Sequence, residues 1–402
     1  MNARVVFLAA FVKHYRVPFY DLLNQALREE GIELRVLYGA PNSAHAARKD
    51  NVDLPPSYSR RVPSYWFADR VVYQSAWKEI AGADLVITPN ENKLLLNPLL
   101  LALRAAGAKG VAFWGKGNIT PASIARPSDW LRYVTANAVD WWFPYTEQSA
   151  ENLRLQGVRC GITPIANSID TSELHRDLDS ISGDCLRHSK RSIGLGHDQI
   201  GVFCGNLSPN KHLDFLFEAG KLIHRVLPNF SLLVLGNGPL REYVELTATR
   251  NRFIRYLGPR IGREKALILK MANVFLLPGS VGLAILDSFV AGLPLLTTEL
   301  ATHGPEFGYL SHGVNGWVSQ HDPQAYANAT IDLLCGPERL AQLSAGAAAS
   351  GHQFGIENMV RHFREGILAC LNALPAHRQP LLSNAPRPRS STAVNDSPGG
   401  QS

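Results

Sequence analysis

Residues at the start of a predicted helix have the types and spacing of a phosphate site. An apolar segment ends at Gly205, a short loop with Asn206 follows, and Lys211 opens a stretch with helical spacing. Loop amides, a helix N-terminus and an ammonium group together stabilise a phosphate anion. An ordinary strand–loop–helix unit with a solvated lysine is the alternative that this segment leaves open.

A glycine pair follows the next apolar segment, at 232–240. The pair is Gly236 and Gly238, separated by Asn237. Glycine allows tight turns and close approach of a ligand to the backbone. Taken alone, the segment fits a plain turn at least as well as a ligand contact.

A third segment, 276–299, joins an apolar strand to a predicted helix near 282–291. The connecting loop consists of Gly279, Ser280, Val281, Gly282 and Leu283. Its amides could meet a diphosphate. Asp287 lies inside the helix among apolar residues, where a carboxylate is costly unless it is paired or hydrogen-bonded. Two ribose hydroxyls would satisfy this acceptor, and an exposed helix aspartate is the alternative.

Two basic loops in the first half of the chain follow predicted strands. The loop 13–20 contains Arg16, whose guanidinium could form a bidentate contact with phosphate. The loop 114–118 contains Lys116 and Asn118. Tyr145 and Glu147 are weaker candidates at a third strand end. Solvated basic turns are the alternative for both loops.

Short apolar runs alternate with amphipathic stretches along the chain, which predicts parallel sheets with helical crossovers. The strands are expected at 4–12, 33–39, 84–89, 109–115, 141–146, 200–207, 231–238, 253–258, 273–279 and 294–299. We therefore predict an α/β protein with two doubly wound, Rossmann-like domains that face each other across a cleft. Ligands bind at the carboxyl edges of such sheets.

The composition of individual segments suggests the domain boundaries. Residues 1–170 form the first domain, a polar stretch at 171–198 is expected to join the domains, and 199–355 form the second. A helix is expected at 356–374, and we expect it to pack back on the first domain. The segment 375–402 is rich in Pro, Ser and Asn and is predicted to be disordered.

Composition limits the classes of function. Of the 402 residues, 46% are hydrophobic, the net charge is +6, and the five cysteines are scattered without a CxxC pair. A reducing, cytoplasmic location is expected. The longest apolar stretch is interrupted by polar residues, so no membrane span is predicted. No nucleic-acid-binding signature is present, while the positive charge fits an anionic ligand or membrane surface.

The motifs in order resemble a known family. GNLSPNKHLD, VLGNGPL, YLG, LLPGSVGLAILDSFVAGLPLLTT and HGPEFGYLSHGVNGWV resemble the C-terminal domain of family 4 glycosyltransferases, also called glycosyl transferases group 1. PIANSID (164–170) is similar to the segment by which that family enters its second domain. The resemblance covers roughly residues 1–373 and implies the GT-B fold.

The resemblance also implies roles for individual residues. Lys211 matches the lysine that binds the donor phosphate, and Asn206 stands where an arginine is usual. Asp287 keeps a carboxylate at the ribose position, whereas Gly279 replaces a glutamate that contacts the donor sugar. The amides of Val281, Gly282 and Leu283 would then take over that contact.

Further positions follow from the same resemblance or lie next to it. Glu306 either supports the donor loop or caps a helix, and His303 could be a polar turn residue. Lys211, Arg16 and Lys116 are the candidate catalytic groups. Lys116 or Asn118 would occupy the space where many members place a histidine.

The expected activity is a retaining, metal-independent sugar transfer. The donor would be a nucleoside diphosphate sugar, and no cofactor or metal is expected. The acceptor would be a glycan or a lipid-linked sugar, as in the biosynthesis of lipopolysaccharide, exopolysaccharide or another cell-surface glycan, with possible peripheral contact at the inner face of the membrane. Two alternatives are a sugar-nucleotide epimerase or hydrolase of the same fold, and a non-catalytic binding subunit, which the changes at Asn206 and Gly279 suggest.

Overall fold

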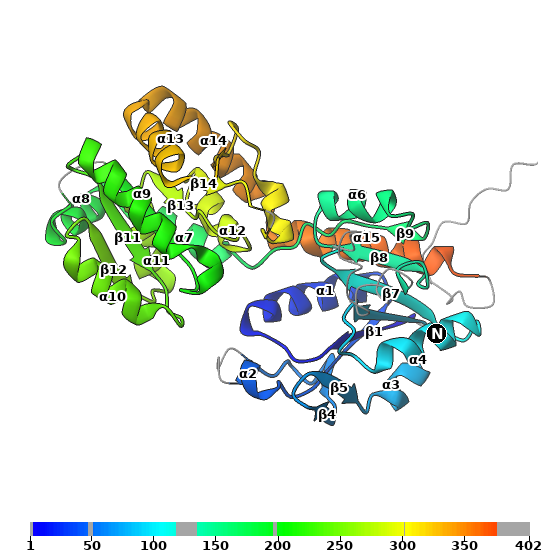
Figure 1. The fold of residues 1–402 in the computed structure, drawn as a ribbon. Coiled ribbons are helices and arrows are strands. Elements are labelled where there is room, and N and C mark those ends of the chain that lie inside the picture. The colour runs from blue at the N-terminus through cyan, green and yellow to red at the C-terminus, as the bar shows by residue number, and fades with distance from the viewer. Residues whose placement is uncertain (1–2, 47–50, 118–134, 196–198, 301, 376–402) are drawn as a thin grey trace, which may run out of the picture.

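The chain forms two α/β domains that lie side by side (Figure 1). The structure is a computed structural model, and it describes residues 3–46, 51–117, 135–195, 199–300 and 302–375. The backbone passes from the first domain to the second after residue 162 and returns near residue 355. Of the tail expected at 375–402, all but the first residue lies outside the described ranges.

The first domain is built on a seven-stranded parallel sheet with the order β3-β2-β1-β6-β7-β8-β9. Its strands are β1 (Arg4–Ala9), β2 (Glu33–Tyr38), β3 (Ser59–Arg61), β6 (Leu85–Pro89), β7 (Gly110–Gly115), β8 (Trp141–Pro144) and β9 (Gly161–Ile162). Helices cover both faces, which explains why the central strands are continuous apolar runs. Val5, Val6 and Phe7 of β1, for example, have no exposed surface.

The helices of the first domain include one from the far end of the chain. The helices are η1 (His14–Arg16), α1 (Val17–Glu29), α2 (Ser43–Ala46), α3 (Trp77–Ala81), α4 (Leu96–Ala105), α6 (Glu147–Leu155) and α15 (Ile356–Ala373). α15 packs beside α1, and its Phe363 ring lies 5.8 Å from Phe7 and 5.1 Å from Phe19, between ring centroids. The C-terminal helix thereby completes the core of the first domain.

A small antiparallel sheet stands apart from the large one. It pairs β4 (Ser64–Phe67) with β5 (Val71–Gln74) and lies at the lower edge of the first domain in Figure 1. The alternation of the sequence did not lead us to expect this hairpin.

The second domain contains a six-stranded parallel sheet with the order β12-β11-β10-β13-β14-β15. Its strands are β10 (Ile200–Cys204), β11 (Ser231–Leu235), β12 (Ile254–Gly258), β13 (Val274–Leu276), β14 (Leu295–Thr298) and β15 (Gly316–Ser319). The helices around it are η3 (Pro209–Lys211), α9 (Leu213–Val226), α10 (Arg241–Arg250), α11 (Gly262–Met271), α12 (Ala284–Val290), η4 (Pro305–Tyr309), α13 (Pro323–Cys335) and α14 (Pro337–Gln353). None of the helices in the described ranges is both long and apolar enough to cross a membrane.

The segment expected to join the domains, 171–198, belongs instead to the second domain. Its described part forms α7 (Ser172–Ser180) and α8 (Gly183–Ser192), and α7 packs against α11. Leu174 and Leu178 of α7, one helical turn apart, enter the second core, and Lys270 of α11 donates a hydrogen bond to the Leu178 carbonyl. The helix is otherwise polar, so its short apolar stripe is easily overlooked in the sequence.

The strand orders place one crevice in each domain. In the first sheet the order reverses between β1 and β6, and in the second between β10 and β13. Loops that leave adjacent strands in opposite directions open a crevice at the carboxyl edge. The predicted site segments 205–212 and 277–283 follow β10 and β13, while 10–16 follows β1.

Candidate functional site

Lys211 lies in the crevice of the second domain, in the 3-10 helix η3. His212 follows in the left-handed conformation with φ 52°, so the long helix α9 begins at Leu213 and not at 211. The half-buried ammonium of Lys211 donates a 2.5 Å hydrogen bond to the carbonyl of Ser280. Burial lowers the pKa of Lys211, and the charge of Glu306 opposes this shift. The lysine therefore joins the two predicted phosphate-binding segments.

Gly279 brings those two segments into backbone contact. A Cβ atom at position 279 would lie 2.4 Å from the carbonyl carbon of Lys211 and 2.5 Å from the Asn210 oxygen. The neighbouring amide of Ser280 donates to that same Asn210 oxygen at 2.8 Å. Glycine thus stands here because two loops touch, so the position where the resemblance places a glutamate has no room for a side chain.

We expect Gly279→Ala to destabilise the second domain by about 1–3 kcal/mol, because an added methyl group must push rigid backbone aside. Gly282→Ala is the matched control, since a Cβ atom there meets nothing within 4 Å. Thermal unfolding of both variants measures the effect. Equal melting temperatures for the two would show that the loops do not touch as described.

The amide of Val281 already has a partner within the protein. It donates to Nδ1 of His303 at 3.0 Å, and His303 Nε2 donates to the carbonyl of Thr298 at 2.7 Å. These two bonds require the neutral imidazole with its proton on Nε2, and burial lowers the pKa of His303 accordingly. The ring also stacks on Phe307 with centroids 4.3 Å apart.

The prediction that the Val281 amide contacts a ligand is therefore corrected, because this amide is bound to His303. The amide of Ser280 is likewise occupied, by Asn210. Among the described residues, the amides of Gly282 and Leu283 find no acceptor. These two amides, which stand directly before α12, are therefore available for an anion.

The Gly236–Gly238 turn packs against the loop that precedes Lys211. Gly236 has φ 140°, and a Cβ atom on it would lie 1.8 Å from the Gly205 carbonyl oxygen. A Cβ atom on Gly238 would lie 2.4 Å from Oδ1 of the exposed Asn206. Asn237 accepts a hydrogen bond from the Leu207 amide at 3.0 Å through its carbonyl. The close approach expected at these glycines is thus an approach of protein loops to each other.

Asp287 is buried in α12, with 9% of its surface exposed, and is paired with a lysine. Nζ of Lys265, on α11, lies 2.7 Å from its Oδ1. Burial alone would lower the pKa of Lys265, but Asp287 and, more weakly, Cys204 and Glu173 outweigh burial and raise it. The sequence led us to expect ribose hydroxyls as the partners of this carboxylate. The Lys265 ammonium already provides one partner, at Oδ1.

A chain of hydrogen bonds crosses from the first domain to the second. Arg16 donates from Nη2 to Asn167 Oδ1 at 2.6 Å, and Asn167 donates from Nδ2 to Glu306 Oε1 at 2.5 Å. Arg16 also donates to the Ser168 carbonyl at 3.2 Å. Tyr309 reinforces the junction by donating its hydroxyl proton to the Asn167 carbonyl at 3.0 Å.

Arg16 is therefore a buried interdomain contact, with 8% of its surface exposed. The sequence led us to expect a guanidinium presented to phosphate, whereas the described side chain is engaged by the segment that connects the domains. Glu306 is also buried, at 5% exposure. Its carboxylate supports the domain junction and, through its charge, the protonated form of Lys211.

The other candidates of the first domain are less engaged. Lys116 is exposed directly after β7, and Asn118 lies outside the described residues. Tyr145 follows β8, and burial raises its pKa to about 12. Glu147 begins α6 and pairs with Arg154 on its exposed surface.

The crevice of the first domain holds a cavity of about 230 Å³ at the β1–β6 switch point. Its wall combines aromatic rings with basic groups and one acid, and it includes Phe11, Lys13, Arg16, Glu91, Lys93 and Trp114. An anion or a polar sugar would meet complementary groups there.

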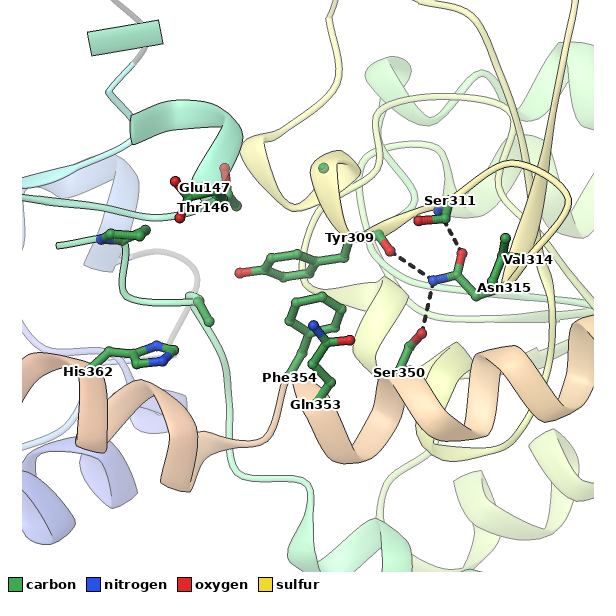
Figure 2. A pocket seen from close by; sticks show the side chains of 13 residues that line it. Thr146, Glu147, Tyr309, Ser311, Val314, Asn315, Ser350, Gln353, Phe354 and His362 are labelled. Atoms are coloured by element: carbon green, nitrogen blue, oxygen red, sulfur yellow. Dashed lines mark hydrogen bonds between the residues drawn. The ribbon is translucent and has the colours of Figure 1, made fainter. Parts of the chain in front are cut away.

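A larger cavity, of about 470 Å³, lies at the junction of the domains. Figure 2 shows Thr146, Glu147 and His362 on one side and Ser311 and Asn315 on the other, with Gln353 beside Phe354 in the middle. Tyr309 and Phe354 stack between these groups, with ring centroids 4.0 Å apart. The wall contains none of the predicted donor residues, so this cavity is distinct from the crevice around Lys211. Within the described residues, no cluster of three or more metal-ligating side chains is found.

Two Rossmann-like domains that face each other across a cleft define the GT-B fold, and solved structures confirm it. HepE of Anabaena in complex with UDP aligns with a TM-score of 0.65 at 13% identity, over 92% of this chain and 100% of that chain. The pneumococcal O-GlcNAc transferase GtfA, in complex with UDP and GlcNAc, aligns with a TM-score of 0.63 at 13% identity, over 92% and 99%.

A family model matches the second domain. Residues 198–335 match the model of the family described as Glycosyl transferases group 1. The boundaries enclose Lys211, the 279–283 loop and Asp287. The family expected from the sequence motifs is thereby confirmed for the domain that carries them.

Curated relatives resemble the chain over part of its length. A D-inositol 3-phosphate glycosyltransferase of Thermobispora bispora is 30% identical over 184 residues, which is 42% of each protein. A GDP-mannose-dependent alpha-(1-6)-phosphatidylinositol dimannoside mannosyltransferase of Mycobacterium tuberculosis is 29% identical over 143 residues, or 34% of this chain and 36% of the relative. The chain thus spans less than half the length of these two relatives.

Sequence reasoning missed three residues of the site region. They are Lys265, Asn167 and Tyr309, which pair with Asp287 or join the domains. Asn167 lies in a segment that the sequence does single out, 164–170. Lys265 and Tyr309 carry no such signal, because their partners lie 22 and 142 residues away in the chain.

Proposed function

We propose that this protein is a glycosyltransferase that moves a sugar from a nucleoside diphosphate sugar to an acceptor. The observation that carries the proposal is the crevice at the β10–β13 switch point. There Lys211, the amides of Gly282 and Leu283, and the buried Asp287 come from the loops and helix that follow neighbouring strands. This combination suits a diphosphate next to a ribose.

The leaving group of such a reaction gathers negative charge as the glycosidic bond breaks. The Lys211 ammonium and the two available amides would stabilise that charge in a setting partly shielded from water. Arg16 and Glu306 would act indirectly, because they join the domains and so hold the two crevices opposite each other. Lys116 is assigned to the acceptor side, where its exposed ammonium can meet an incoming substrate.

The donor is proposed to be a nucleoside diphosphate sugar, in line with the UDP complexes named for the two solved structures. We further propose retention at the anomeric carbon and no need for a metal ion. The acceptor is proposed to be a glycan or a lipid-linked sugar of the cell surface. The basic, aromatic cavity at the β1–β6 switch point supports an acceptor that combines hydroxyl groups with an anionic group.

A binding screen followed by product analysis tests the proposal. Calorimetry with UDP, GDP and ADP in EDTA should reveal tight binding of at least one nucleotide, because the site uses an ammonium and amides. Incubation with the matching sugar nucleotides should then release nucleoside diphosphate faster when a lipid-linked acceptor is added. Free sugar or an epimer without an acceptor would indicate a hydrolase or epimerase, and failure to bind any nucleotide would indicate a non-catalytic subunit.

A further inference from the structure

The β4–β5 hairpin has one buried and one exposed face. Tyr65 pairs with Tyr73 and Trp66 with Val72, so alternate residues of the hairpin share a face. Residue Val72 also bridges Leu94, which extends the small sheet by a third segment. Val72 and Leu94 are buried against Ala10, with Trp66 packed beside them. This inner face attaches the hairpin to the first domain.

The outer face is aromatic and open to solvent. Tyr65 is 57% exposed, Phe67 55% and Tyr73 38%, and the two tyrosine rings lie 6.5 Å apart in a stacked arrangement. Leu95, one residue beyond Leu94, is 43% exposed. Trp77 and Leu99, on the helices that follow, are 45% and 43% exposed. Tyr65, Phe67 and Tyr73 thus gather three exposed rings on one face of the hairpin, and such a group marks an interaction site.

Two acidic side chains near the hairpin are paired with arginines, whereas two basic side chains have no charged partner. Glu79 is paired with Arg60 at 2.8 Å, and Asp53 with Arg61 at 3.5 Å. Arg70, at the tip of the hairpin, and Lys78, next to Trp77, are exposed and have no charged partner among the described residues. Asp69, next to Arg70, is engaged by the Ser43 amide at 3.0 Å, so Arg70 and Lys78 are the basic groups without a charged partner that these segments of the described chain present.

We propose that the outer face of the β4–β5 hairpin docks on a lipid bilayer that contains anionic lipid. Tyrosine and tryptophan combine an apolar ring with a polar tip, which suits the boundary between headgroups and acyl chains. Unpaired Arg and Lys at the rim would meet anionic headgroups. The inference deepens the proposed function and depends on it in one respect, because it takes the acceptor to be carried by a membrane.

The hairpin connects this surface to the crevice of the first domain. Its inner face packs on Ala10 and Phe11, which line the cavity at the β1–β6 switch point. Lys93 belongs to the same cavity, and its carbonyl accepts a hydrogen bond from the Val72 amide at 2.8 Å. Docking would therefore hold the proposed acceptor cavity close to the membrane, because the inner face of the hairpin packs directly on residues of the cavity wall.

Sedimentation of the full-length protein with vesicles tests the docking surface. Vesicles would contain phosphatidylcholine with or without about 30 mol% phosphatidylglycerol. The protein should bind the anionic vesicles, and Tyr65→Ser with Phe67→Ser should weaken that binding about tenfold or more, because two rings no longer enter the lipid. Arg70→Gln with Lys78→Gln should reduce the difference between anionic and neutral vesicles.

A matched control comes from exposed apolar residues of the second domain. Tyr243→Ser with Leu246→Ser on α10, where the residues are 42% and 58% exposed, should leave vesicle binding unchanged. Absent vesicle binding by the parent, or equal binding by the hairpin variant, would overturn the proposal. A change of oligomeric state in that variant would assign the face to a second copy of the chain and would equally overturn it.

Nucleotide binding, measured on the same preparations, separates this inference from the proposed function. A parent protein that binds a nucleoside diphosphate but does not bind anionic vesicles refutes the membrane surface alone. Docking without nucleotide binding refutes the glycosyltransferase and leaves the surface in place.

Discussion

Replacing Lys211 with alanine should weaken the binding of a nucleoside diphosphate by about ten- to hundredfold. The expected loss corresponds to about 1.5–3 kcal/mol for a charge-assisted hydrogen bond in a partly buried site. The lysine contacts the Ser280 carbonyl at 2.5 Å and so also fixes the loop that contributes the free amides. Calorimetric titration with the nucleotide that the parent binds most tightly measures the effect.

Lys221→Ala is the matched control for Lys211→Ala. Lys221 lies on α9, a few turns further along the chain, where its exposed ammonium pairs with Glu218 at 2.6 Å. An exposed pair of this kind contributes little to stability or to a distant site. Unchanged affinity in the Lys211 variant, or an equal loss in the Lys221 variant, would show that the phosphate site lies elsewhere.

Replacing Asp287 with alanine should both destabilise the second domain and abolish tight nucleotide binding. Removal of the carboxylate leaves the ammonium of Lys265 largely buried without its partner, which costs about 3 kcal/mol. The side chains of Lys265 and Asp287 are only 23% and 12% exposed, so water cannot replace the lost contact well. The free energy of urea unfolding should fall by that amount.

A double substitution separates the two effects of Asp287. Lys265→Met with Asp287→Leu removes both charges and should recover most of the stability, because an apolar pair needs no compensation. Nucleotide binding should remain lost, since no carboxylate is left to accept the ribose hydroxyls. Normal nucleotide affinity in the double variant would exclude Asp287 from the site, and unaltered stability of Asp287→Ala would exclude a buried ion pair.

Much of the architecture could be predicted from local sequence patterns. Apolar runs such as 231–238 and 294–299 contain β11 and β14, and the GT-B fold expected from the alternation and the motifs is confirmed. The ends of elements were less predictable, because a single residue can end a helix. His212 is an example, since its left-handed backbone separates Lys211 from α9.

The contacts within the candidate site could not be predicted, because they depend on residues distant in the chain. Whether the Val281 amide is free depends on His303, and whether Arg16 faces a ligand depends on Asn167. The hairpin was missed for a related reason. The exposed face of these strands carries aromatic rings. They therefore lack the alternation of apolar and polar residues by which half-buried strands are usually found. The roles predicted for Lys211, Asp287 and Lys116 stay predictions.

The return of α15 to the first domain has a consequence for biosynthesis. Phe363, Ile367 and Cys370 have no exposed surface and fill the same core as β1 and α1, which are made first. During translation, the face of the first domain that α15 covers therefore stays open to solvent while the whole second domain is synthesised. A nascent chain with such an open apolar face is prone to association, and its first domain reaches its native state only after the ribosome has added the second domain and α15.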